Sequence, residues 1–282
     1  MIKVVMDSGG DLPAKLLKML DISVVPINIH FRDGVYKDRI DIESEEFYRR
    51  VEEEKVIPKT AQPSPYQFAE AYREIARKSG ATDIISVNIT SQLSGTHASS
   101  LLAAQEVADE VRVHPFDSRS GSGGQGLMVL EAARMAADKV SLDRIMERLE
   151  TMRENMTIFL VLDNLRFAQM SGRVGAVAAA LSSLLKIKPV LYVQDGMLEM
   201  AERVRTSRRA LDSMVAMVKE RIGDELANVV VIHAEAPEVA QALVERVQTE
   251  FRVGELFVEK LSLALAVHLG PGTVGLVACP VE

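Results

Sequence analysis

One stretch of this 282-residue chain constrains its fold more than any other: a short apolar run, residues 83–89, that leads into a hydroxyl-rich loop and then a helix. The run is typical of a buried strand, and residues 98–104 favour a helix. The loop between them comprises residues 90–96 and carries four Ser and Thr side chains. In an open α/β sheet, ligands usually bind beyond the carboxyl ends of the strands, and amide groups at a helix start favour an anionic oxygen. Two interpretations stay open here: the loop binds an acid, or Ser94 or Thr96 only caps the helix.

Strands and helices alternate through the first half of the chain, from a strand at residues 2–6 to a helix that ends near Glu154. Such alternation predicts a parallel sheet covered on both faces. The second half differs, because two β-rich runs flank Asp195-Gly196 as in a hairpin. We therefore predict an α/β protein with two domains, residues 1–155 and 156–282.

Local signals predict where several elements begin and end. Asp11 is expected to cap the first helix, and Ser44 the next one. Pro26 makes residues 23–29 an edge strand or an irregular one. The helix that follows the hydroxyl-rich loop is expected to reach about Glu110.

The composition excludes several classes of protein. A net charge of −7 argues against a nucleic-acid partner, which requires a basic face. The single cysteine, Cys279, rules out an internal disulfide and fits a reducing compartment. The first apolar run is too short for a signal peptide and no run is long enough to span a membrane, so we expect a cytoplasmic protein without stable membrane insertion.

Several catalytic and cofactor motifs are incomplete or absent. Gly121, Gly123 and Gly126 match the letters of a dinucleotide fingerprint, but the region about twenty residues further on is predicted as helix rather than as a second strand. Close backbone approach or a turn before a helix at residues 127–137 explains these glycines better. The chain has neither a GxxxxGK[ST] phosphate loop nor a GxSxG elbow, and its five histidines are scattered. We expect no metal and no cofactor.

Three turns carry hydroxyl or imidazole groups next to Gly or Pro: Lys59-Thr60, Ser94-Gly95-Thr96, and His268 through Gly272. Functional groups concentrate in loops. Each turn also has a structural explanation, a simple turn hydroxyl for Thr60 and a locally hydrogen-bonded imidazole for His268. The three turns together indicate a site more strongly than any one of them.

The order and spacing of these turns, with other short motifs along the whole chain, resemble the DegV family of fatty-acid-binding proteins. The motifs that carry the resemblance are Asp7-Ser8 with Asp11-Leu12-Pro13, residues 59–65, residues 91–96, Asp117-Ser118, Ser171-Gly172-Arg173, residues 188–191 with Asp195-Gly196, Arg203-Val204-Arg205 and residues 268–272. Two positions depart from the family pattern: Ala61 stands where a serine is common, and Ser171 where the first of two glycines is common.

The resemblance implies a two-domain protein, with an N-terminal three-layer α/β/α domain around a mainly parallel sheet and a C-terminal two-layer α/β domain with a mixed sheet. It also implies that a long-chain fatty acid such as palmitate is buried between the domains. Thr60 and Ser94 would bind its carboxylate, with His268 beside them. A protonated His268 would add charge assistance.

The resemblance further implies a lipid-binding carrier rather than an enzyme, which acts with a separate fatty acid kinase. Arg173 and Arg205 would face that partner or the phosphoryl-transfer step. A helix of small residues at 174–185 and some of the thirteen methionines would leave an adaptable wall for the acyl chain.

Two other functions stay open at this stage. The hydroxyl-rich loop with Ser94 is compatible with a serine-dependent hydrolase or a phosphotransferase, although the base motif and the phosphate loop are missing. A regulatory module that senses a lipid or another small acid is the third possibility.

Overall fold

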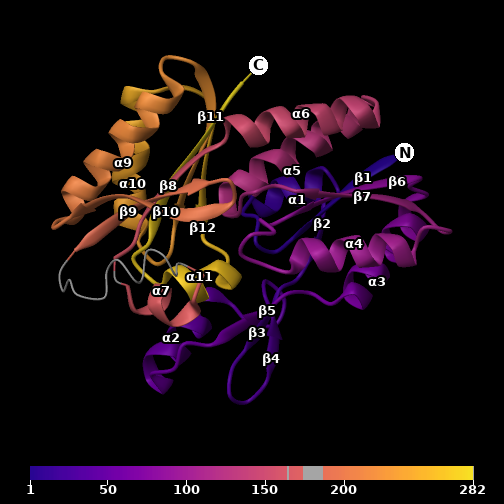
Figure 1. Cartoon of the computed structure of the whole chain (residues 1–282), viewed down its shortest axis with the longest axis horizontal. Helices are drawn as coiled ribbons and strands as arrows, with labels where there is room; N and C mark the ends of the chain where they lie inside the picture. The colour runs from indigo at the N-terminus through magenta and orange to yellow at the C-terminus, as the bar shows by residue number, and fades with distance from the viewer. Residues whose placement is uncertain (164, 174–186, 282) are drawn as a thin grey trace.

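The computed structural model describes residues 1–163, 165–173 and 187–281, and its sheets and helices stack in layers (Figure 1). The first half of the chain forms a four-stranded, fully parallel sheet in the order β2-β1-β6-β7. Its strands are β1 (Ile2–Asp7), β2 (Ser23–Val25), β6 (Asp83–Asn88) and β7 (Arg112–Asp117). The central strand β6 is buried along its whole length, as its apolar run predicts.

The second half forms a six-stranded mixed sheet in the order β10-β9-β8-β13-β11-β12. Only β11 and β12 are parallel among its described pairs. The predicted hairpin joins β9 to β10 through Asp195 and Gly196, which both have positive φ angles, the geometry of a tight hairpin turn. The strands are β8 (Thr157–Val161), β9 (Lys188–Gln194), β10 (Met197–Val204), β11 (Leu226–His233), β12 (Arg252–Lys260) and β13 (Val274–Pro280).

Helices cover both sheets. α3 and α4 pack on one face of the parallel sheet, and α5 packs on the other. α5 and α6 also contact the mixed sheet, whose opposite face is covered by α9 and α10 (Figure 1). These helices are α3 (Pro65–Ser79), α4 (Thr96–Glu106), α5 (Ser122–Ala137), α6 (Leu142–Asn155), α9 (Ser207–Ile222) and α10 (Pro237–Glu250). The chain therefore has the α/β architecture that the resemblance implies, a three-layer first half and a two-layer second half with a mixed sheet.

Gly123 and Gly126 of the glycine motif lie inside α5, which begins at Ser122 and not at 127 as predicted, and Gly121 is its N-cap. A Cβ at Gly123 would lie 2.8 Å from the Cβ of Val230 in the mixed sheet, and one at Gly126 would overlap the carbonyl oxygen of Asp11. These glycines allow α5 to approach both neighbours closely, which was one of the two explanations that the sequence favoured.

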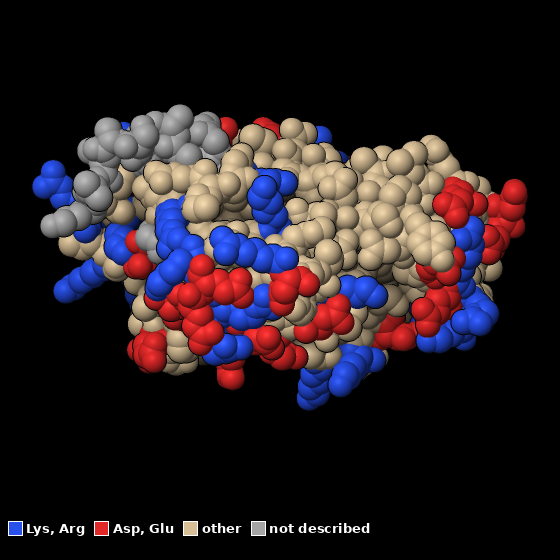
Figure 2. Space-filling view, turned by 90° about the horizontal axis from the view of Figure 1, so that it is seen from below, with Lys and Arg blue, Asp and Glu red and all other residues tan. Residues whose placement is uncertain are grey.

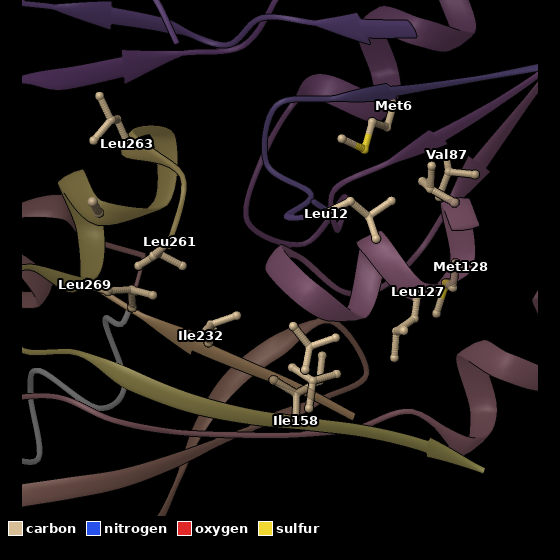
Figure 3. Packing of buried hydrophobic residues seen from close by; sticks show 14 of the residues in the cluster. Met6, Leu12, Val87, Leu127, Met128, Ile158, Ile232, Leu261, Leu263 and Leu269 are labelled. Atoms are coloured by element: carbon tan, nitrogen blue, oxygen red, sulfur yellow. The ribbon is translucent and has the colours of Figure 1, made fainter. Parts of the chain in front are cut away.

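The largest hydrophobic cluster joins the two halves of the molecule around α5. Leu12 and Leu127 from the first half lie close to Ile158 and Ile232 of the mixed sheet (Figure 3). The predicted domain boundary falls where α6 passes into β8. Because one cluster contains residues from both sides of that boundary, the division into two domains stays a prediction.

Residues 23–29 form two strands in two different sheets rather than one edge or irregular strand; β2 does lie at the edge of its sheet, whereas β3 is central in its own. The chain leaves the parallel sheet after β2, passes Pro26, and enters a small antiparallel sheet in the order β4-β3-β5. The strands of this small sheet are β3 (Asn28–His30), β4 (Val35–Lys37) and β5 (Lys59–Ala61). The small sheet carries Thr60 to the junction of the two halves.

Several predicted helix ends are wrong, each for a local reason. Asp11 does not cap a helix: Pro13 takes that position, and the buried Asp11 carboxylate binds groups from distant segments. Ser44 is the first residue of its helix, with Glu43 as the N-cap. α4 ends at Glu106, four residues early. The remaining described helices are α1 (Ala14–Met19), α2 (Ser44–Glu54), α7 (Arg166–Ser171) and α11 (Leu263–Leu269).

Within the described residues, none of the helices combines the length and the apolar character needed to cross a bilayer.

Candidate functional site

A cavity of about 450 Å³ lies beyond the carboxyl end of β6, between the small sheet, the start of α4 and α11. This volume falls within the range of roughly 300–1,000 Å³ typical of small-molecule sites. Its polar lining includes Thr60, Gln62, Ser94, His97, Arg173 and His268. The three turns identified in the sequence therefore border one cavity, although up to 208 residues separate them.

The element that carries His268 was not predicted. His268 lies in the last turn of α11, and the turn of residues 270–273 follows it. Gly270 ends the helix with a φ of 79°, and the Thr273 hydroxyl donates to the carbonyl oxygens of Leu269 and Gly270. The Gly270 turn and the Thr273 hydrogen bonds fix the end of α11 and direct His268 toward the cavity.

His268 and Thr60 form the central contact of the site. The Nε2 atom of His268 lies 2.9 Å from the Thr60 hydroxyl, and its Nδ1 atom is buried without a hydrogen-bond partner among the described residues. Burial, and secondarily the positive charge of Arg173, lower the pKa of His268 to about 4. The imidazole is therefore neutral at pH 7 without a ligand, and charge assistance from a protonated His268 to a bound carboxylate stays a prediction.

Ser94 makes only short-range contacts. Its hydroxyl lies 2.8 Å from the Thr96 hydroxyl and accepts the Thr96 N–H at 3.3 Å. Neither residue is the N-cap of α4, because Gly95 occupies that position. The capping interpretation is therefore replaced by a local hydroxyl turn whose Ser94 side chain borders the cavity.

Three contacts fix the hydroxyl-rich loop. Directly before the loop, the Ile89 amide donates to the buried Asp7 carboxylate at 2.8 Å. The Thr90 hydroxyl donates to the carbonyl oxygen of Gly196 in the β9–β10 turn, and the Ser91 amide donates to Asp117. The loop is thus held by both sheets, so the Ser94 hydroxyl has a defined position.

The two arginines implied by the resemblance occupy different places. Arg173 lines the cavity and is exposed. Arg205 does not line it; this exposed residue lies just beyond the end of β10. At Ser171, the departure from the family pattern is accommodated because Ser171 is helical and Gly172 alone supplies the left-handed turn.

Two polar lining residues were missed in the sequence. Gln62 follows Thr60 by two residues, and its amide packs against Gly95, where a Cβ would lie 2.6 Å from Nε2. The His97 ring lies 3.3 Å from the Asn88 amide oxygen, and burial lowers its pKa. Both belong to segments already singled out, so their position next to the loop motifs was the available signal.

Aliphatic side chains form the rest of the wall, and no methionine is among the described lining residues. The main apolar contributors are Ile27, Ile89, Leu101, Leu198, Leu265 and Leu269. The helix predicted at residues 174–185 lies outside the described residues.

The arrangement suits binding better than nucleophilic catalysis. The Ser94 hydroxyl pairs with another hydroxyl, whereas an activated serine needs a hydrogen-bonded base. His268, one candidate base at the cavity, is bonded to Thr60. Within the described ranges, no group of three or more His, Cys, Asp or Glu residues is arranged to hold a metal.

Comparisons with known proteins agree on one family. The family model described as an uncharacterised protein of the DegV family matches residues 1–281. A DegV domain-containing protein of Staphylococcus aureus is 34% identical over 278 residues, which cover 98% of this chain and 96% of that protein.

Solved structures are similarly close. A structure described as showing fatty acid binding of a DegV family protein from Thermus thermophilus is 33% identical, with a TM-score of 0.93 and 99% of both chains covered. A stearic acid-binding protein from Eubacterium ventriosum is 26% identical, with a TM-score of 0.91, 99% of this chain covered and 98% of that one.

Proposed function

Because this chain belongs to the DegV family, we propose that it binds a long-chain fatty acid in the cavity, with the carboxylate held by Thr60 and Ser94 beside His268. The observation that carries the proposal is the hydrogen-bonded pair of Thr60 and His268, which borders the same cavity as Ser94. The fatty-acid ligands of the Thermus thermophilus and Eubacterium ventriosum proteins support the choice of ligand.

Neutral groups can bind the carboxylate without a buried counter-charge. When Nε2 of His268 carries the proton, it donates to the Thr60 oxygen and frees the Thr60 proton for the ligand. The Ser94 hydroxyl donates to the carboxylate when it rotates away from Thr96. Hydrogen bonds to a charged group contribute about 1.5–3 kcal/mol each, and hydroxyls avoid the desolvation cost of burying a cation.

The acyl chain supplies most of the affinity. At about 0.8 kcal/mol per buried CH₂, some fifteen methylenes contribute on the order of 12 kcal/mol before ordering costs are deducted. The aliphatic wall offers the surface against which they would pack. The tail therefore supplies most of the affinity, and the hydroxyls add a smaller share and determine the position of the carboxylate.

We further propose that the protein presents the carboxyl group of the bound fatty acid to a fatty acid kinase or another partner in lipid metabolism. Arg173, at the cavity mouth, and Arg205 face that partner. In this role the protein is a cytoplasmic carrier, and the partner supplies the chemistry.

Organic extraction of the purified protein, followed by mass spectrometry, tests the ligand assignment. We expect one long-chain fatty acid per wild-type chain, and a reduced amount in Thr60→Ala and Ser94→Ala, because each loses a hydrogen bond of about 1.5–3 kcal/mol. Thr60→Ser keeps the hydroxyl and is the matched control, so it retains the ligand. Full retention of fatty acid in both alanine variants contradicts the head-group assignment, and its absence from wild type contradicts the proposed function.

A further inference from the structure

Asp38 directly follows β4 and is buried, although it carries a carboxylate. Figure 2 shows the face that Figure 1 places at the bottom, with the small sheet and α2, and there acidic and basic side chains lie next to one another at the surface. Arg49 and Glu53 of α2 form one such exposed pair. Because only 1% of Asp38 is exposed, its contacts are with the interior of the protein.

One carboxylate oxygen of Asp38 connects two elements that lie far apart in the sequence. The Oδ2 atom accepts the Ser8 hydroxyl at 2.7 Å and the amide of Ala264, the second residue of α11, at 3.4 Å. The Ser8 hydroxyl in turn accepts the Ile27 amide at 3.0 Å, and the Asp38 amide donates to the Ile27 carbonyl oxygen. Asp38 and Ser8 therefore join the start of α11 to the residue just before β3.

Each of the two connected elements positions one member of the Thr60–His268 pair. Ile29 of β3 lies opposite Thr60 of β5 in the small sheet. His268 follows Ala264 by four residues on α11, which is about 6 Å along a helix. The 2.9 Å contact between Thr60 and His268 therefore depends on how α11 packs against the small sheet. Ile27 and Ala264 also line the cavity, so both ends of the connection lie at its wall.

The neighbouring carboxylate of Asp11 makes a different connection. It accepts the Ser262 amide just before α11, but its other partners, Arg39 and Ser122, lie outside the small sheet. Asp11 thus holds α11 to the start of α5, and it continues to do so when Asp38 is replaced. Loss of the Asp38 carboxylate should therefore shift α11 rather than release it.

The second carboxylate oxygen of Asp38 is unsatisfied. The Oδ1 atom is buried and has no hydrogen-bond partner among the described residues. An unsatisfied buried charge costs free energy, and a well-packed apolar residue would avoid that cost. Local features that cost stability are typical of functional positions. Stability alone therefore does not account for a carboxylate at residue 38.

We propose that Asp38 is a positioning residue for the fatty-acid carboxylate, because it sets α11 against the small sheet so that His268 and Thr60 stay in contact. This inference rests on the proposed function and adds a residue that aligns the head-group site from outside it. Asp38 is not among the described residues that line the cavity, so it acts through its partners Ser8 and Ala264.

Competitive displacement of a fluorescent polyene fatty acid by myristate and by 1-tetradecanol tests the proposal. The two competitors have the same chain, so the ratio of their dissociation constants measures the contribution of the head group. In Asp38→Ala the preference for myristate should fall about tenfold, which corresponds to one hydrogen bond to a charged group. Ser8→Ala removes the link to Ile27 and should lower the preference as well, so it carries the test if Asp38→Ala does not fold.

An NMR titration of the imidazole gives a second readout. Burial lowers the pKa of His268 to about 4 in the wild type, and in ligand-free Asp38→Ala this pKa should move toward its ordinary value. The ring resonances of His114, which contacts Asp83 at the amino end of the parallel sheet, should stay unchanged.

Two variants separate positioning from a general loss of stability. Asp38→Asn keeps a side-chain oxygen that accepts from Ser8 and Ala264, and should retain most of the wild-type preference for myristate. Leu243→Ala opens a cavity beneath α10, on the far face of the mixed sheet, and should lower the thermal midpoint without changing the preference.

A wild-type preference in Asp38→Ala, or in Ser8→Ala where Asp38→Ala does not fold, overturns the inference. An equal fall in Leu243→Ala or in Asp38→Asn does so too, as does an unchanged titration of His268 in Asp38→Ala. Failure of the proposed function is read separately, because the wild-type protein would then bind neither competitor or show no preference between them.

Discussion

Two groups of polar side chains, one buried and one half-buried, lie close together in this molecule and differ in their partners. In one, the carboxylates of Asp7, Asp11 and Asp38 accept hydrogen bonds from distant parts of the chain. In the other, the hydroxyls and imidazole at the cavity pair with one another, as Thr60 does with His268. Buried acceptors that the chain itself satisfies hold the fold, whereas groups paired with each other beside a cavity can exchange that partner for a ligand.

The largest effect on stability is expected among the buried carboxylates, at Asp11, which joins the two halves of the molecule. Asp11 accepts from Arg39, Ser122 and the Ser262 amide, and its side chain is fully buried. Asp11→Ala leaves these donors unsatisfied, so the free energy of unfolding should fall by about 3–5 kcal/mol in guanidinium denaturation. Asp41→Ala, which removes an exposed carboxylate bonded to the Lys37 amide, is the control and should cost less than about 1 kcal/mol. Equal losses of stability in Asp11→Ala and Asp41→Ala would contradict the structural role of the buried carboxylates.

The pH dependence of stability should have opposite signs in the two groups, and Asp7 tests the first. Burial raises the pKa of Asp7 to about 6, despite hydrogen bonds from the Ile89 and Gly9 amides. Between pH 4 and 6 the folded state therefore binds more protons at this site than the unfolded state. Relative to Asp7→Asn, wild-type stability should fall by up to about 3 kcal/mol as the pH rises through this window. Urea titrations at several pH values measure the difference, and a flat difference contradicts the prediction.

His268 should produce the opposite slope. Because burial lowers its pKa to about 4, the unfolded state binds more protons between pH 4 and 6.5. This contribution to stability is complete above pH 6.5 and is lost as the pH falls toward 4. Since His268 is not fully buried, we expect a loss of about 2 kcal/mol relative to His268→Gln in ligand-free protein. An NMR titration of the imidazole that gives an ordinary pKa would contradict it.

The same contrast explains how much the sequence could predict. The strand–loop–helix unit at residues 83–104 and the hairpin at Asp195-Gly196 follow from local patterns, and the structure confirms them. Asp11 was predicted as a helix cap because its partners, Arg39, Ser122 and Ser262, lie 28 to 251 residues away. Local rules cannot detect a carboxylate that the tertiary fold satisfies.

The candidate site shows the same limit. The family resemblance names Thr60, Ser94 and His268. Their separation in the sequence does not give the distances between these side chains in the fold. The low pKa of His268 could not be predicted because it depends on burial by segments remote in sequence. Gln62 and His97 adjoin the loop motifs but were missed, because the sequence does not show which side chains of those segments face the cavity.

The smallest effect is expected at Gly95, where the cavity meets a flexible side chain. A Cβ there would approach the Gln62 amide, and the backbone φ of −75° suits any residue. Gln62 is exposed and can move aside, so Gly95→Ala should change the free energy of unfolding by less than about 1 kcal/mol. Gly126→Ala is the matched comparison, since its Cβ would meet the rigid Asp11 backbone and should cost roughly 1–3 kcal/mol or more. If Gly95→Ala were as costly as Gly126→Ala in chemical denaturation, the cavity wall would be as rigid as the core, and the groups around it could not exchange partners for a ligand as proposed.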